Sequence, residues 1–412
     1  MKQTAESDLR IIDNKKIAGG RVKNRNPVWK EHFMETTKRN GIIVAGTLTL
    51  DITPVFESKK KAKSVDEVFV PGKVVHMEGM DIHPGGAVTN TGLGLKVLGA
   101  KVRTVGKVGK DVLGDIIVKF YDQYGAAGDL IVDPEISTSY SIALTPPGID
   151  RMFLHDPCAG NTFRKEDVAP ALYETNQIFH YGYPPVSRLL YLNGGAGCIA
   201  MLEEAKAAGI ATSVDMCAVD PECESGKEDW KDIIRRMCPN VDFFEPSIEE
   251  LLFYLDRDKY EKMYAEAENG DMIGLLDIER DVRPLAETLI GWGAGVVLVK
   301  CGYKGLYLAA GGADRLAKIG GGLVLEPEDW AGARSFEKSY VPDQVLSGTG
   351  AGDTTIAAFL YAVTLGYGRE RCLQLATGTG ASCVAAYDAL SGLKSFDELI
   401  RKIDSGWEKQ NV

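Results

Sequence analysis

The chain has 412 residues, of which 45% are hydrophobic and 25% charged, a balance typical of globular proteins with a large core. The formal net charge of −11 argues against a phosphate-backbone partner, because nucleic-acid binding depends on a basic excess. No apolar run approaches the roughly 18 residues that a membrane helix needs, and residues 1–10 are too polar for a signal peptide. We therefore expect a cytoplasmic protein with no nucleic-acid or membrane partner.

A polar stretch precedes the first apolar run of the chain. Residues 1–40 are rich in Lys, Arg and Asn and show no sustained hydrophobic period, so we expect an N-terminal extension. The run Ile-Ile-Val-Ala-Gly at 42–46 is typical of a strand buried on both faces of a parallel sheet. Similar runs recur at 210–215 and 295–300.

Helix-like stretches alternate with these runs and lie at 199–208, 249–255 and 353–365. Strands that alternate with helices predict an α/β fold with a doubly wound, mostly parallel sheet. We interpret the charged, partly helical stretch at 257–285 as an insertion, and the pattern assigns it no role.

Two regions interrupt this alternation. Residues 66–80 and 138–154 alternate polar and apolar side chains, and the second region contains the turn sequence Pro-Pro-Gly at 146–148. That pattern suits a small antiparallel sheet with one solvent-exposed face. We therefore expect a β lid inserted into the α/β core, built from segments at about 52–82 and 136–158.

A glycine-rich turn carries the clearest chemical signal. The sequence at 347–353 is Ser-Gly-Thr-Gly-Ala-Gly-Asp, and residues 354–363 continue as a helix of small and apolar side chains. Backbone N–H groups at such a helix start are free and carry the positive end of the helix dipole. The amides of Gly350, Ala351 and Gly352 are therefore expected to form an anion hole.

Asp353 occupies the first turn of the same predicted helix. There the dipole is expected to lower its pKa and keep the carboxylate ionised. A general base next to an anion hole is the arrangement that phosphoryl transfer to a hydroxyl requires. The turn is not a Walker loop, because no Gly-Lys-[Ser/Thr] follows the glycines, and helix capping alone is the alternative interpretation.

The turn resembles the C-terminal signature of the PfkB/ribokinase family of carbohydrate and nucleoside kinases, approximately Asp-Thr-x-Gly-Ala-Gly-Asp. The stretch at 85–100 resembles the N-terminal signature of that family, and 106–115 continues in the family manner. The resemblance covers residues 41–405 as one kinase domain and leaves 406–412 as a tail. It implies a ribokinase-like three-layer core, ATP and Mg²⁺ as cofactors, and phosphorylation of a hydroxyl on a small sugar or nucleoside. It also implies a lid that closes over the sugar and often forms a homodimer.

The resemblance assigns substrate contacts near the N-terminal signature. Residues 46–51 resemble the family's first strand, whose terminal Asp binds sugar hydroxyls, and a carboxylate accepts two hydroxyl hydrogen bonds at once. The implied substrate-binding residues are Asp51, Gly85, Gly86 and Asn90. A turn or helix cap is the alternative interpretation of Asp51.

Two further stretches resemble the nucleotide side of the family's site. Residues 245–250 resemble an Asn-x-x-Glu element that arranges magnesium and the nucleotide phosphates, with Ser247 in place of Asn. This implies that Glu250 holds a magnesium-bound water, whereas a capping box of Ser247 and Glu250 fits the same spacing. Residues 300–305 resemble a strand and turn that the nucleotide approaches, although an ordinary hairpin also uses such glycines. The implied nucleotide-binding residues are Ser247, Lys300, Gly302 and Gly305.

Several positions depart from the family pattern. Ser347 and Gly348 stand where the family usually has Asp-Thr, and that Asp helps to hold a monovalent cation in many members. A serine hydroxyl is a weaker ligand, so dependence on a monovalent cation stays open. Thr49 and residues 87–88 differ in the sugar pocket, so substrate identity is not transferred from the better-known ribokinases.

Three functional interpretations are compared. A kinase for a free sugar or sugar acid, with Asp353 as general base, is favoured over a nucleoside kinase, for which Phe56, Phe69, Phe153 and Phe163 would supply a base pocket. The serine replacements suggest a catalytically reduced sugar-binding sensor or scaffold, but a pure binder would not need an intact Gly-Ala-Gly-Asp. A nicotinamide dehydrogenase is disfavoured because no glycine fingerprint follows the first strand.

Overall fold

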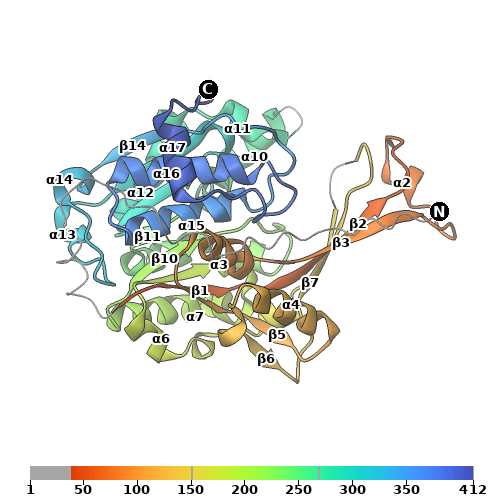
Figure 1. The fold of residues 1–412 in the computed structure, drawn as a ribbon, viewed down its shortest axis with the longest axis horizontal. Helices are drawn as coiled ribbons and strands as arrows, with labels where there is room; N and C mark the ends of the chain where they lie inside the picture. The colour runs from red at the N-terminus through yellow and green to blue at the C-terminus, as the bar shows by residue number, and fades with distance from the viewer. Residues whose placement is uncertain (1–38, 150–151, 268–269, 412) are drawn as a thin grey trace. The chain divides into compact units, whose positions relative to one another are not determined.

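A computed structural model of the protein describes residues 39–149, 152–267 and 270–411 (Figure 1). Residues 1–38, which make up nearly all of the expected extension, lie outside the described residues. Among the described residues, no helix is both long and apolar enough to cross a membrane.

The core is built on an eight-stranded sheet. Its strands, in spatial order, are β14 (Arg334–Lys338), β13 (Gly305–Ala310), β12 (Val296–Lys300), β11 (Phe243–Phe244), β10 (Ala211–Asp215), β9 (Ile178–Gly182), β1 (Ile42–Gly46) and β4 (Val102–Val105). The pairings from β4 through β12 are parallel, and β13 and β14 are antiparallel to their neighbours. The runs predicted as buried strands are β1, β10 and β12.

Helices cover both faces of this sheet and give three layers. Along β1, Ile42 and Val44 pack into one hydrophobic cluster, and Ile43 and Ala45 pack into the other, as alternation along a strand requires. The helices over the Ile43 face are α6 (Pro170–Thr175), α7 (Arg188–Ala207), α8 (Trp230–Met237), α9 (Ile248–Leu255) and α12 (Arg283–Gly291). Those over the Ile42 face are α3 (Ala87–Leu98), α13 (Ala313–Leu316), α14 (Pro327–Trp330), α15 (Ala351–Thr364), α16 (Arg369–Cys383) and α17 (Phe396–Asp404). The predicted doubly wound α/β fold is confirmed.

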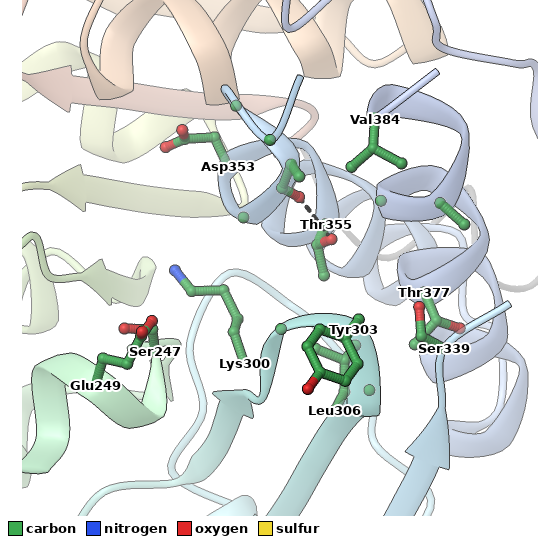
Figure 2. Close-up of a pocket in the computed structure, with 18 of the residues that line it drawn as sticks. Ser247, Glu249, Lys300, Tyr303, Leu306, Ser339, Asp353, Thr355, Thr377 and Val384 are labelled. Atoms are coloured by element: carbon green, nitrogen blue, oxygen red, sulfur yellow. Dashed lines mark hydrogen bonds between the residues drawn. The ribbon is translucent and has the colours of Figure 1, made fainter. Parts of the chain in front are cut away.

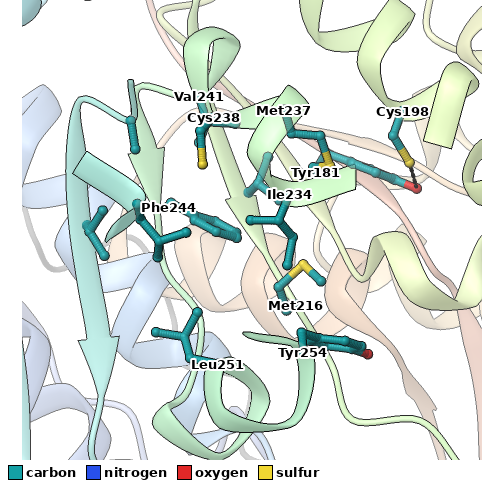
Figure 3. Packing of buried hydrophobic residues seen from close by; sticks show 14 of the residues in the cluster. Tyr181, Cys198, Met216, Ile234, Met237, Cys238, Val241, Phe244, Leu251 and Tyr254 are labelled. Atoms are coloured by element: carbon teal, nitrogen blue, oxygen red, sulfur yellow. Dashed lines mark hydrogen bonds between the residues drawn. The ribbon is translucent and has the colours of Figure 1, made fainter. Parts of the chain in front are cut away.

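The Ile43 face contains a large apolar cluster. Figure 3 shows Ile234 of α8 and Leu251 of α9 close to Phe244 of β11, and all three side chains are buried. Each Å² of apolar surface removed from water contributes about 25 cal/mol to stability, so this cluster holds the layers together. The packing fixes α9 against the sheet, next to the strand ends that carry the site.

A second sheet of four strands is inserted in the chain between β1 and β9. Its order is β3 (Met77–Gly85), β2 (Thr49–Phe56), β7 (Tyr140–Leu144) and β8 (Met152–Asp156), with β2 parallel to β7 and the other pairs antiparallel. Nearby lie α4 (Val112–Gln123), α5 (Cys158–Asn161) and a short pair, β5 (Lys107–Gly109) and β6 (Ile131–Asp133). The alternating segments thus form an inserted sheet, but the expectation of a fully antiparallel one is wrong, because β2 and β7 pair in parallel. A role as a lid stays a prediction.

The predicted alternation at 66–80 is only partly a strand. Residues 77–80 belong to β3, but Val65–Val68 form a short helix, α2, with Asp66 and Glu67 in its first turn. Acidic side chains are favoured at that end of a helix. A turn follows in which Lys73 N–H donates to the Val70 carbonyl, with Pro and Gly at its two central positions. Local turn and helix signals therefore outweigh the polar–apolar alternation here.

The stretch at 257–285 and the C-terminal tail, which the sequence left without a role in the core, also form defined structure. In 257–285, the described residues form α10 (Arg257–Glu266), α11 (Met272–Leu275), a π-helical turn (Ile278–Val282) and the start of α12. In the expected tail, Gln410 N–H donates to the Ser339 carbonyl at 2.8 Å, and the Trp407 ring stacks on Tyr340 at 4.6 Å.

Candidate active site

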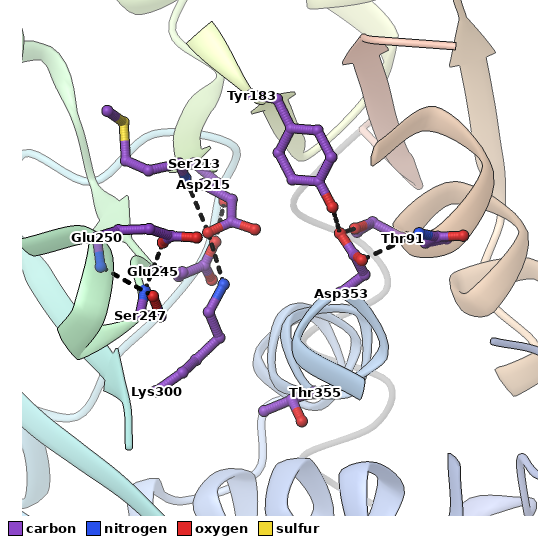
Figure 4. A network of polar contacts seen from close by, with 12 residues as sticks. Thr91, Tyr183, Ser213, Asp215, Glu245, Ser247, Glu250, Lys300, Asp353 and Thr355 are labelled. Carbon is purple, nitrogen blue, oxygen red and sulfur yellow. Dashed lines mark hydrogen bonds and ion pairs between the residues drawn. The ribbon is translucent and has the colours of Figure 1, made fainter. Parts of the chain in front are cut away.

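Asp353 lies in the first turn of α15 and is almost fully buried (Figure 4). The hydroxyl of Tyr183 donates a hydrogen bond of 2.6 Å to Oδ1, and Nδ2 of Asn90 donates one of 3.1 Å to Oδ2. The Thr91 hydroxyl lies 3.4 Å from Oδ1. Tyr183 follows β9, and Asn90 and Thr91 belong to α3, so side chains from two other elements orient this carboxylate.

The pKa of Asp353 is shifted opposite to the expectation from the sequence. Burial raises this pKa above its ordinary value, and hydrogen bonds from Tyr183, Asn90 and Thr91, with the charge of Lys300, oppose the shift only in part. The expectation of a lowered pKa considered the helix dipole but not the loss of solvent around a carboxylate that is 6% exposed. A carboxylate with a raised pKa is a stronger base near neutral pH.

The turn before α15 has a backbone conformation that glycine permits. Gly350 caps the helix with φ of 72°, and a Cβ atom placed there would lie 2.2 Å from the Cβ of Ala389. Among the three amides expected to form the anion hole, that of Ala351 donates to the Gly348 carbonyl at 3.3 Å. N–H groups of the first turn, such as that of Gly352, have no acceptor within the helix and are available to an anion.

A buried ion pair lies across from Asp353. Nζ of Lys300, at the end of β12, lies 2.6 Å from Oδ1 of Asp215, at the end of β10. Burial raises the pKa of the Asp215 carboxyl, and the Lys300 ammonium opposes that shift. Burial alone would lower the pKa of Lys300, but the carboxylates of Asp215, Glu250 and Asp353 raise it above its ordinary value. The site therefore holds a protonated lysine.

A cavity of about 580 Å³ opens beside Asp353, within the usual range for small-molecule sites. Its lining includes all of the predicted catalytic, nucleotide-binding and metal residues: Asp353, Gly350, Ala351, Gly352, Ser247, Lys300, Gly302, Gly305 and Glu250. Figure 2 shows Asp353 and Lys300 on one side of the view, with Leu306 and Val384 further along the lining. The cavity is therefore charged beside Asp353 and more apolar away from it.

Ser247 and Glu250 form the capping box that their spacing permits. The Ser247 N–H donates to Oε2 of Glu250 at 2.6 Å, and the Glu250 N–H donates to the Ser247 hydroxyl at 3.1 Å. Both residues also line the cavity. Within the described ranges, no group of three His, Cys, Asp or Glu side chains is arranged to hold a metal ion.

The predicted substrate residues are absent from the cavity lining, and one of them, Asn90, contacts Asp353. Asp51 of β2 approaches Gly85 of β3 so closely that a Cβ on Gly85 would lie 2.0 Å from Oδ2 of Asp51. Gly86 is the N-cap residue of α3 and has φ of 81°. Burial raises the pKa of Asp51 to about 6. Asn90 connects this group to Asp353 through its hydrogen bond, so Asp353 stands between the two sets of predicted residues.

Sequence reasoning missed Tyr183 and Asp215 as site residues. Tyr183 follows the last residue of β9, and Asp215 is the last residue of β10. Ligands of doubly wound sheets bind at the carboxyl ends of parallel strands, so position at a strand end was the available signal. The sequence does not show that β9 and β10 lie next to each other and near α15.

A row of buried polar side chains lies beneath the ion pair. Nδ1 of His180 lies 2.7 Å from the Ser213 hydroxyl. That hydroxyl donates to Oε2 of Glu245 at 2.6 Å, and Figure 4 shows Ser213 and Glu245 near the ion pair. Burial raises the pKa of Glu245 to about 8 and lowers that of His180 to about 3. Nε2 of His180 and Oε1 of Glu245 are buried without a hydrogen-bond partner among the described residues.

Comparisons with known proteins identify the family and the fold of the chain. The sequence pattern of the pfkB family carbohydrate kinases matches residues 57–395. An uncharacterised sugar kinase of Archaeoglobus fulgidus is 24% identical over 304 residues, which cover 73% of this chain and 98% of that protein.

Solved structures share the fold. A fructokinase of Xylella fastidiosa with bound ATP has a TM-score of 0.64 at 17% identity, with 88% of this chain and 98% of that chain covered. A ribokinase of Arabidopsis thaliana complexed with ribose and ATP has a TM-score of 0.62 at 18% identity, with the same coverage of 88% and 98%. The family match over most of the chain establishes a phosphotransferase, and the chain belongs to the pfkB family of carbohydrate kinases.

Proposed function

We propose that the protein transfers the terminal phosphoryl group of ATP to a hydroxyl of a small sugar or sugar acid, with Asp353 as the general base. One observation carries this proposal. The buried Asp353 carboxylate lines the cavity and accepts hydrogen bonds from Tyr183 and from Asn90, one of the expected substrate residues. In that position it takes the proton of an acceptor hydroxyl while the phosphoryl group moves.

The negative charge of the moving phosphoryl group is stabilised at the start of α15. The amides of Gly350, Ala351 and Gly352 and the positive end of the helix dipole supply this stabilisation, the Gly352 amide most directly. The ammonium of Lys300 lines the same end of the cavity and attracts the nucleotide phosphates.

Mg²⁺ would be held near Glu250. Carboxylate oxygens and water are the ligands that this ion prefers, and Glu250 lines the cavity with one oxygen engaged in the cap and one left over. Ser247, Gly302 and Gly305 border the same space. When bound, the ion neutralises charge on the nucleotide phosphates.

The substrate hydroxyls would be bound by Asp51, Asn90 and the backbone at Gly85 and Gly86. The close approach of Asp51 to Gly85 places a carboxylate beside glycine backbone with no side chain between them, which suits a polyol. With a pKa of about 6, Asp51 is ionised at neutral pH and accepts hydroxyl hydrogen bonds.

A sugar is favoured over a nucleoside as the acceptor. Phe163 is buried in the core, and the rings of Phe56 and Phe69 pack edge to face on each other at 6.1 Å. These three side chains are thus packed against protein, and the fourth candidate, Phe153 of β8, is mostly exposed, so the four do not form an aromatic pocket for a base.

We also propose that the β3-β2-β7-β8 sheet forms a homodimer contact. Met80, Phe153 and Leu154 on its strands are each more than half exposed, and burial against a second copy would remove them from water. Light scattering after size exclusion is expected to show a dimer that Phe153→Asp weakens; a monomeric wild type would contradict the contact.

A substrate panel tests the proposed reaction. ATP consumption would be measured with wild-type protein, Mg²⁺ and separate free sugars, sugar acids, sugar phosphates and nucleosides. We expect turnover with a sugar or sugar acid. Turnover with nucleosides alone would overturn the substrate class, and sugar binding without ATP consumption would support the sensor interpretation.

A further inference from the structure

The insertion at 257–285 contacts the cavity lining at one turn. The residues Gly302–Lys304 form a 3₁₀ turn after β12, and Gly302 and Tyr303 line the cavity. The Tyr303 hydroxyl donates a hydrogen bond of 3.0 Å to Oδ2 of Asp271 in the insertion. The contact therefore joins a cavity-lining side chain to a part of the chain outside the sheet.

Further contacts hold the same turn. Nζ of Lys304 donates to the carbonyl of Leu276 at 2.7 Å. Gly302 has φ of 53°, and a Cβ there would lie 3.0 Å from Cγ1 of Ile273, so the turn packs directly against α11. Ile273 is itself buried in the core, which anchors α11 to the main body of the domain.

Asp271 is also fixed independently of Tyr303. Its Oδ1 caps α11 by accepting a hydrogen bond of 3.2 Å from the Gly274 N–H, which leaves Oδ2 for Tyr303. The aromatic ring is therefore held at its hydroxyl end. A held ring loses less conformational freedom when a ligand packs against it.

Tyr303 lies away from the charged end of the cavity. Figure 2 places it next to Leu306, whereas the side chain of Lys300 extends away from it toward the side of the view where Asp353 lies. If the phosphates occupy the space beside Lys300 and α15, the remaining space beside Tyr303 and Leu306 receives the apolar part of the nucleotide. A ring face and an aliphatic side chain suit a planar base and its ribose.

We infer that the insertion positions Tyr303, through Asp271, as the wall that binds the nucleoside half of the nucleotide. This inference rests on the proposed function, because it takes the cavity to be the nucleotide site. It gives the insertion a role in nucleotide affinity and none in phosphate binding.

Calorimetry with two probes, ADP and inorganic tripolyphosphate, tests the inference on full-length protein. Tyr303→Ala removes the ring and is expected to weaken ADP binding about tenfold, the scale of one lost base–aromatic contact. Tripolyphosphate binding is expected to stay within about twofold of wild type, because the phosphates lie at the Lys300 end.

Tyr303→Phe keeps the ring and removes only the hydroxyl, so it leaves the Asp271 cap intact. It is expected to weaken ADP binding about threefold, as loss of one modest hydrogen bond would. Asp271→Ala is expected to weaken ADP binding at least as much, because it also removes the α11 cap. The double variant should fall short of the sum of the two effects, because the contact between Tyr303 and Asp271 is lost only once.

Unchanged ADP binding in Tyr303→Ala, or equal weakening of ADP and tripolyphosphate, would overturn the inference. Fully additive effects of Tyr303→Phe and Asp271→Ala would overturn the role of the insertion. Wild-type protein that binds neither probe would instead contradict the proposed function. A melting curve for each variant identifies loss of folding, and Tyr303→Phe keeps the test decisive if Asp271→Ala unfolds.

Discussion

Nδ2 of Asn90 donates a hydrogen bond of 3.1 Å to Oδ2 of Asp353, although the two residues are 263 positions apart in the chain. Asn90 belongs to α3, beside the predicted substrate residues, and Asp353 belongs to α15, beside the cavity. The bond therefore joins the two halves of the proposed site. It also shows how the two sequence signatures meet, because α3 and α15 pack side by side on the same face of the sheet.

Tyr183 influences the pKa of Asp353, the proposed general base. Its hydroxyl donates to Asp353 at 2.6 Å and lowers the pKa of that carboxyl, opposing the effect of burial. In Tyr183→Phe the pKa of Asp353 is expected to rise further, so the acidic limb of the kcat–pH profile moves to higher pH. Tyr191→Phe is the control, because its hydroxyl contacts Glu224 instead. An unchanged limb in Tyr183→Phe would contradict Asp353 as the titrating group.

Breaking the buried ion pair of Asp215 and Lys300 is expected to lower the free energy of unfolding. Lys300→Met leaves Asp215, which is 2% exposed, without its counter-charge and is expected to cost about 3 kcal/mol. Asp215→Asn in the same chain should recover part of the loss. Urea unfolding measures both.

The matched control for Lys300→Met is an exposed pair. Nζ of Lys59 lies 2.8 Å from Oε2 of Glu78, and most of both side chains is exposed to solvent. Lys59→Met is expected to cost less than about 1 kcal/mol. Equal losses for the two lysine variants would show that burial of the Asp215–Lys300 pair does not matter.

Glu245 is expected to make the fold less stable as the pH rises through neutrality. Burial raises its pKa in the folded protein to about 8 from an ordinary value of 4.5, so folding takes up a proton between these values. Stability is then fully present below 4.5 and is lost as the pH rises through 8. The charged groups packed around this carboxyl include Lys300, which opposes the shift.

Titration of His180 changes the stability with pH in the opposite direction, and it does so at lower pH. Its pKa falls from 6.5 to about 3, so its contribution to stability rises with pH only up to 6.5. Between pH 6.5 and 8 the effect of Glu245 stands alone in this pair. The free energy of unfolding, measured in urea, should fall less between pH 6.5 and 8 in Glu245→Gln than in wild type. Equal falls in the two proteins would contradict the raised pKa of Glu245.

Gly350 and Gly348 give a matched pair of glycine substitutions. Gly350→Ala puts a side chain at φ of 72°, in contact with Ala389, and is expected to cost at least about 1–2 kcal/mol and to lower kcat. Gly348→Ala meets no atom within 4 Å and is expected to change stability by less than about 0.5 kcal/mol. Similar unfolding curves for the two variants would show that the turn tolerates a Cβ at position 350.

Much of the fold follows from local sequence. The run at 42–46 is β1 residue for residue, because a strand buried on both faces must be continuously apolar. By contrast, β9 was not predicted, since His180 interrupts its apolar character and finds its partner, Ser213, on the neighbouring strand. Pairing of that kind depends on strand order, which the sequence does not state.

Some features of the site also follow from local sequence, and others depend on residues distant in the chain. The turn ending at Asp353 is a local motif, so its position in the first turn of α15 follows from the sequence. The direction of its pKa shift does not, because burial depends on Tyr183 and α3, which are distant in the chain. Ser247 forms the predicted helix cap and also lines the cavity, and its role in nucleotide binding stays a prediction.

The most direct test of the account is turnover by Asp353→Asn. The amide has nearly the shape of the carboxylate but accepts no proton, so kcat with the accepted sugar is expected to fall by about a hundredfold to ten-thousandfold. Binding of ADP and of the sugar should stay within about twofold of wild type, because Lys300 and Asp51 remain in place. Near-normal kcat in Asp353→Asn with every accepted substrate would contradict Asp353 as the general base.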